Sequence, residues 1–316
     1  MTIAPTIQTA ERSVHGVRPQ MPRPRDVLRE HLHAIGYALR VPMLIAVALG
    51  VLATIILAIQ IGSGDLDYNF LTQPSVLPGV IGALLPVAMW LREERFGPGF
   101  LWTLPVDRRR HALLKTLAGW LWLMGGVTLF VLSLLVLALV SGGGVLPVQT
   151  MTTLTDALRL SGPVNPAALQ TVQWTPGALI WAVPFGSATA LYLLASAIVL
   201  GIRYLLRWAI VLVFLLPIAT GATHLISRLS GNEWLADMPA RALVQLVEGR
   251  FGLEALLTLR TWSLDNRATL TTGERIHVWS SIPDLADWRT AALLWTVAGL
   301  LALWAAASRH REERRA

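Results

Sequence analysis

The apolar positions of this chain gather into long uninterrupted runs instead of alternating with polar ones. Six runs approach or exceed the roughly 20 residues that a helix needs to cross the hydrocarbon core of a bilayer. They cover residues 41–61, 76–91, 117–140, 177–201, 206–226 and 289–307. Within these bounds the only Asp, Glu, Lys or Arg residues are Arg207 and Arg289, which lie at the first turn of their runs and outside the apolar bodies. The pattern therefore predicts an all-α polytopic membrane protein, with a transmembrane domain of six helices over 41–307.

A second pattern precedes the first run. In residues 24–40 apolar side chains recur at helical spacing with arginines between them, and the apolar set is Leu28, Leu32, Ile35 and Leu39. This periodicity is typical of an amphipathic helix, and a basic one is expected to lie in the interface of a membrane. Residues 1–23 have no apolar run behind a basic start, so we expect a disordered cytosolic tail and no cleavable signal peptide.

The distribution of charge predicts how the helices are oriented. Only 14% of the residues are charged, against about a quarter in soluble domains. Basic residues concentrate in every second connection, namely the N-terminal segment, the loop 90–116, the link with Arg203 and Arg207, and the tail 308–316. The positive-inside rule places these segments in the cytoplasm. The long loop 227–288 has six arginines against eight acids, but loops of this length translocate largely regardless of charge. We therefore expect a protein of the inner (plasma) membrane with both termini on the cytoplasmic side. The outer loop 227–288 is expected to form one or two amphipathic helices that pack on the outer face of the bundle or re-enter the interface.

The composition gives little support for an enzyme active site in this chain. The chain has no cysteine, which excludes thiolate metal sites and a cysteine nucleophile. A phosphate loop needs GxxxxGK[ST], but the only lysine, Lys115, follows two leucines. The arginines are divided among short loops and do not form one basic face, which disfavours nucleic-acid binding. We therefore expect no catalytic, cofactor-binding or metal-binding residue in this chain, and any ATP-binding site on a separate protein.

Residues 90–119, WLREERFGPGFLWTLPVDRRRHALLKTLAG, resemble the cytosolic signature of permease subunits of type-2 ATP-binding cassette (ABC) transporters. In that family an acidic, glycine-containing segment leaves the second span, an LPV-S/D-R element follows, and a lysine begins the third span. The layout of the chain is similar as well, with a larger outer segment between the fifth and sixth spans. The matching residues are Glu93, Glu94, Gly97, Leu104, Pro105, Val106, Asp107, Arg108 and Lys115.

The resemblance implies a half-transporter, with export as the expected direction. It would dimerise with a second copy or a paralogue and be driven by a separate ABC ATPase subunit, which binds the ATP and also touches the amphipathic helix. The coupling element that contacts the ATPase would be Arg92, Glu93, Glu94, Arg95, Phe96 and Gly97. The hinge would be Leu104, Pro105, Val106, Asp107, Arg108 and Lys115. For Arg109 and Arg110, topology and contact with anionic lipid headgroups are favoured over ATPase contact.

Two other classes of function stay open on the sequence alone. A membrane-embedded enzyme would need a polar constellation within the spans. A non-transporting sensor or assembly module could share the topology without the coupling element. Co-purification of an ATPase chain distinguishes the permease from both.

Overall fold

A computed structural model describes a large part of the chain. The described residues are 25–37, 40, 52, 55, 59, 74–90, 108–140, 148–154, 165–202, 242, 244–259, 267–273, 275–279 and 282–312. Of the predicted spans, 206–226 lies outside this set, and 41–61 contributes only Leu52, Ile55 and Ile59 to it.

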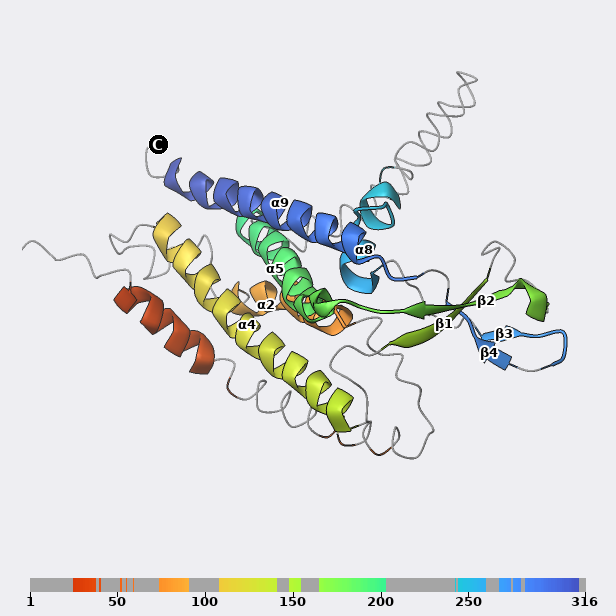
Figure 1. Cartoon of the computed structure of the whole chain (residues 1–316). Helices are drawn as coiled ribbons and strands as arrows, with labels where there is room; N and C mark the ends of the chain where they lie inside the picture. The colour runs from red at the N-terminus through yellow and green to blue at the C-terminus, as the bar shows by residue number, and fades with distance from the viewer. Residues whose placement is uncertain are drawn as a thin grey trace, which may run out of the picture.

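The described part of the chain is mostly helical (Figure 1). An unlabelled helix covers 25–37, and the labelled helices of the bundle are α2 (Val76–Trp90), α4 (Arg108–Val140), α5 (Val183–Gly201) and α9 (Leu285–Glu312). A 3₁₀ helix, η3 (Ala178–Ala182), leads into α5. Among the described residues, three stretches are long and apolar enough to cross a membrane, Arg109–Leu139, Ala178–Gly201 and Leu285–Ser308. They suit a membrane-embedded protein, while the count of six spans stays a prediction.

Helix α4 begins earlier than the sequence pattern indicates. Its first residue is Arg108, whereas the apolar run starts at 117, so the last part of the predicted loop 90–116 is helical. Arginine, leucine and lysine all have high helix propensity. The helix therefore extends through the basic residues before the apolar run, where His111 and Lys115 pack against other helices. Hydrophobicity marks the part of a helix that suits lipid, and it does not mark where the helix itself starts.

Two β-hairpins correct the all-α prediction. Strands β1 (Gln149–Leu154) and β2 (Leu169–Trp174) pair antiparallel, with the short 3₁₀ helix η2 (Pro166–Ala168) before β2. Strands β3 (Arg267–Thr269) and β4 (Arg275–His277) form the second pair. The first two strands are rich in threonine, a residue that favours extended backbone. Their alternation is short and half polar, so a search for long apolar runs passes over it.

The hairpins and helix α8 (Leu253–Thr258) lie together at one end of the bundle (Figure 1). The backbone N–H of Trp279 donates to Thr152 O at 2.8 Å, which joins the β4 side to β1. Within the predicted outer loop, Leu256 is fully buried. Part of that loop is therefore helical and packed on the bundle, and part of it is strand.

The helices of the bundle have definite directions relative to one another. Along α5 and α9 the pairs of neighbours run in the same order: Gly186 lies beside Trp288, Gly299 beside Leu193, and Gly201 beside Ala306. The two helices are therefore parallel. Helix α4 runs the opposite way, because Trp120 bonds Thr189 while the earlier Thr116 accepts from the later Tyr192. Helix α2 runs from Ser75, beside α8, to Trp90, beside Lys115.

Candidate functional site

The structure describes only some of the residues that the sequence marks as functional. The coupling residues 92–97, the hinge residues 104–107 and Leu39 lie outside the described part of the chain. Arg108 is the first residue of α4. Lys115 lies where the end of α2 meets α4, and Leu28, Leu32 and Ile35 lie on helix 25–37, which contacts α4 at His111 and Trp122.

Lys115 ties the end of α2 to α4. Its side chain is only 6% exposed, its Nζ donates to Met89 O at 3.1 Å, and the same Nζ lies 4.2 Å from the centroid of the Trp90 ring. The carbonyls in the last turn of a helix have no partner within the helix and carry the negative end of its dipole. A lysine ammonium that reaches the penultimate carbonyl and the final aromatic ring of α2 is a strong cap for that helix.

Tyr192 brings α5 to the same point. It is 1% exposed, and its hydroxyl donates to Thr116 O at 2.7 Å and lies 3.8 Å from Met89 Sδ. Thr116 Oγ1 in turn donates to Ala112 O within α4. A carbonyl that accepts from outside its own helix draws the two helices together. We call the set Met89, Trp90, Lys115, Thr116 and Tyr192 the Lys115 junction.

Helix 25–37 lies against α4 through its apolar face. Ile35 is buried and Leu28 and Leu32 are half-buried, whereas Arg29 and His33 are exposed. The predicted apolar stripe thus faces protein over the residues that the structure describes. Whether this helix also lies in a membrane interface stays a prediction.

Two ring systems fix helix 25–37 to α4. Trp122 Nε1 donates to Leu32 O at 3.0 Å, and the rings of His31 and His111 meet edge-on with centroids 4.7 Å apart. Gly36 allows the first contact, because a Cβ at that position would lie 2.5 Å from Trp122 Cζ2. A glycine in the middle of a helix costs roughly 0.5–1 kcal/mol relative to alanine, and here it permits an indole to lie against the backbone.

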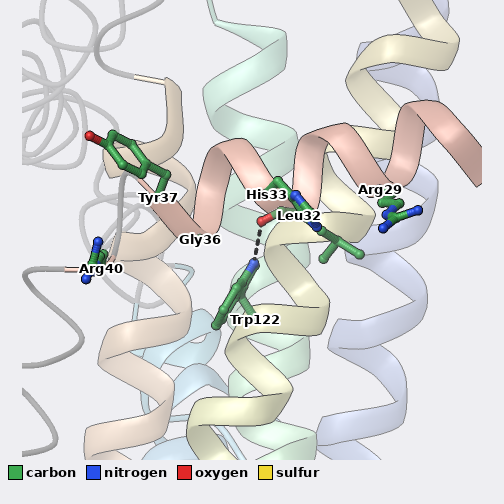
Figure 2. Close-up of a pocket in the computed structure, with 7 residues that line it drawn as sticks. All are labelled: Arg29, Leu32, His33, Gly36, Tyr37, Arg40 and Trp122. Carbon is green, nitrogen blue, oxygen red and sulfur yellow. Dashed lines mark hydrogen bonds between the residues drawn. The ribbon is translucent and has the colours of Figure 1, made fainter.

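A shallow groove of about 670 Å³ opens beside this contact (Figure 2). Its lining is Arg29, Leu32, His33, Gly36, Tyr37, Arg40 and Trp122, and we call it the Trp122 groove. The indole of Trp122 lies below the helix, between Arg29 toward one end and Arg40 toward the other (Figure 2).

The end of α9 reaches the same end of the bundle. The Arg109 guanidinium carbon lies 5.6 Å from the centroid of the Trp304 ring. The end of α2, the start of α4 and the end of α9, which adjoin basic segments, therefore lie close together around Arg109 and Lys115. Sequence reasoning assigned roles to Lys115 and Arg109 but not to Tyr192, His111 or Trp122.

Signals for two of these contacts, that of Trp122 with Gly36 and that of Tyr192 with Thr116, were present in the sequence. Gly36 interrupts an otherwise good amphipathic helix, which indicates close approach of another element. Tyr192 carries a hydroxyl within an apolar run, and a buried hydroxyl requires an acceptor. Neither signal names its partner, since the partners are 86 or 76 positions away in the chain (122 − 36 and 192 − 116).

Comparison with known proteins adds no relatives. No protein-family model, curated protein or solved structure matches the chain. Within the described residues no group of three or more His, Asp or Glu side chains is placed to hold a metal ion. The functional argument therefore rests on the geometry of the Lys115 junction and on the sequence of the segment beside it.

Proposed function

We propose that this chain is the permease half of an ABC transporter. It would couple ATP hydrolysis by a separate ATPase subunit to movement of a substrate, in the direction of export, across the inner membrane. The observation that carries the proposal is the Lys115 junction. It joins the two helices that flank residues 91–107, the segment whose sequence resembles a coupling element.

Through the Lys115 junction, a displacement of residues 91–107 would be passed on to the neighbouring helices. Segment 91–107 leaves α2 after Trp90 and enters α4 at Arg108. Because Lys115 of α4 bonds the carbonyl of Met89, a displacement of the segment moves the end of α2 and the start of α4 as a pair. Tyr192 passes the displacement on to α5 through its bond to Thr116. A partner that binds the segment can thus act on three helices at once.

The helix directions support the membrane topology in this proposal. Helices α5 and α9 are parallel. If both cross a membrane, the chain between them must cross an odd number of further times, and the apolar run 206–226 supplies one crossing. Helix α4 is antiparallel to α5, as consecutive spans must be. These directions are the ones expected of spans three, four and six of a protein with both termini on one side.

Co-purification is the direct test. The full chain, tagged at its C-terminus and expressed in its own host, would be extracted in detergent and purified. We expect a second chain with a phosphate loop to accompany it, identified by mass spectrometry, together with Mg-ATP hydrolysis in the purified fraction. The variant Glu93→Arg/Glu94→Arg should lose at least about tenfold of the bound ATPase, since charge reversal at an interface costs more than about 1.4 kcal/mol.

The control makes the same change of charge elsewhere. Glu233→Arg/Glu248→Arg lies in the predicted outer loop and should leave the bound ATPase unchanged. Absence of any ATPase chain from the wild-type preparation, or full retention of it by the Glu93 and Glu94 variant, contradicts the proposal. The first result would favour a membrane-embedded enzyme or a sensor or assembly module.

A further inference from the structure

Polar side chains form a stripe along helix 25–37, next to its buried face. At 100° per residue, Arg29, His33, Tyr37 and Arg40 fall within an arc of about 80°. All four are exposed and all four line the Trp122 groove. The carboxylates of the same helix, Asp26 and Glu30, are exposed but do not line it. The residues that line the groove therefore include two arginines and no carboxylate.

The four polar groups fall into two pairs, each with one arginine. Arg29 and His33 are one helical turn apart, and so are Tyr37 and Arg40. The two arginines are separated by 11 residues (40 − 29), which corresponds to about 16 Å along a helix. The two arginine side chains lie toward opposite ends of the groove (Figure 2), so each is assigned its own phosphate. Each pair combines a guanidinium with a second hydrogen-bonding side chain, the arrangement that suits a phosphate group.

The floor of the groove is apolar and continues along α4. Trp122 forms the floor, and the same face of α4 carries Leu129 and Val136 at seven-residue intervals, each 53% exposed. A Cβ added at Gly126 would meet nothing within 4 Å, so this face has open space beside it. From Trp122 to Val136 the path is about 21 Å long, which is enough for the hydrocarbon of one leaflet, about 15 Å.

We propose that the Trp122 groove binds anionic phospholipid, with one phosphate at Arg29 and His33 and another at Tyr37 and Arg40. The indole of Trp122 would lie against the glycerol region, and the acyl chains would follow Leu129 and Val136. Charge complementarity selects an anion, and the apolar path along α4 selects a lipid over a soluble phosphate. The proposal requires only a membrane protein and does not depend on an ATPase partner.

Native mass spectrometry of the full chain in detergent tests this directly. Phosphatidylglycerol and phosphatidylcholine would be titrated separately. We expect two phosphatidylglycerol molecules to bind at least about tenfold more tightly than phosphatidylcholine, since charge-assisted bonds contribute at least about 1.4 kcal/mol each. Arg29→Gln and Arg40→Gln should each remove one tight binding event, and the double variant both.

Matched variants and a soluble competitor complete the test. Arg25→Gln/Arg289→Gln removes the same charge from exposed positions outside the groove and should keep both tight events. Thermal unfolding of every variant should match the wild type, because the arginines are exposed. Equal affinity for the two lipids, or unchanged phosphatidylglycerol binding by the double variant, overturns the proposal. Displacement of the lipid by millimolar inorganic phosphate would do so as well, because it would assign the site to a soluble anion.

Discussion

At the α8 end of the bundle two small side chains, Ser187 and Ser75, make short hydrogen bonds between elements. Ser187 Oγ donates to Leu256 O at 2.6 Å and accepts from Trp288 Nε1 at 3.0 Å, and Ser75 Oγ donates to Leu257 O at 2.5 Å. At the Lys115 end the bonds are made by long side chains that reach from one helix to another. Lys115 Nζ donates to Met89 O at 3.1 Å, and Trp122 Nε1 to Leu32 O at 3.0 Å.

The difference has a mechanical consequence. A serine hydroxyl has one rotatable bond to its backbone, so its acceptor can shift little before the bond is lost. A lysine has four, and it can follow a moving acceptor at the cost of up to about 2 kcal/mol of side-chain entropy when it is held. We therefore expect the α8 end to stay fixed while the Lys115 end changes its arrangement. The following substitutions test that contrast.

The largest effect is expected at Ser187. Ser187→Ala removes the acceptor of Trp288 and the donor to Leu256, and both partners are then left in the buried cluster below α8. An unsatisfied buried polar group costs about 1–3 kcal/mol, so the loss of stability should be near 3 kcal/mol, measured by unfolding in detergent. Ser308→Ala is the control, since its hydroxyl bonds only Trp304 O of its own helix. If the two variants are equally stable, the α8 end is not a buried polar anchor.

The next effect tests the seam between α2 and α5 that connects the two ends. In Gly82→Ala the new Cβ would lie 2.6 Å from Ala188 O, a backbone atom that cannot turn aside. The helices must separate, and overpacking of this kind costs about 1–3 kcal/mol. Gly125→Ala is the opposite control, because nothing lies within 4 Å of its Cβ, and it should stabilise the protein by about 0.5–1 kcal/mol. If Gly82→Ala stabilised the protein as Gly125→Ala is expected to do, the seam would not be close-packed.

Sequence patterns predicted these regions unequally. The apolar runs around α2 and α5 predicted helices close to those observed, because hydrophobic helices of that length have few other arrangements. The bonds of Ser187 to Leu256 and Trp288 join positions 69 and 101 residues apart, and no local pattern specifies such partners. Lys115 was predicted as part of the hinge and as the start of the third span. Its buried bond to α2 depends on how two helices meet, which a single sequence does not encode visibly.

The third prediction separates stability from coupling at the Lys115 end. Lys115→Met keeps the aliphatic stem but loses the bond to Met89 O and the charge over Trp90. Removing a buried charge also removes its desolvation cost, so stability should change by about 1 kcal/mol or less. Under the proposed function, the rate of Mg-ATP hydrolysis by the co-purified ATPase should then be the same whether or not the permease variant is bound to it. A large loss of stability would assign Lys115 to the fixed framework and erase the contrast between the ends.

The smallest effect is local and uses two tryptophans of α4. Trp122→Phe loses the bond to Leu32 O of helix 25–37, and Trp120→Phe loses the 3.2 Å bond to Thr189 Oγ1 of α5. Each lost bond should cost about 1 kcal/mol. Among the described residues, helix 25–37 is attached through Trp122 and through the His31–His111 contact, so Trp122→Phe should raise its amide hydrogen exchange about fivefold, the factor that 1 kcal/mol represents. Helix α5 is held by several neighbours, so the exchange of its amides should hardly change in Trp120→Phe. Equal responses would mean that helix 25–37 is as firmly built into the bundle as α5, and a partner acting on it would then have to move the whole structure.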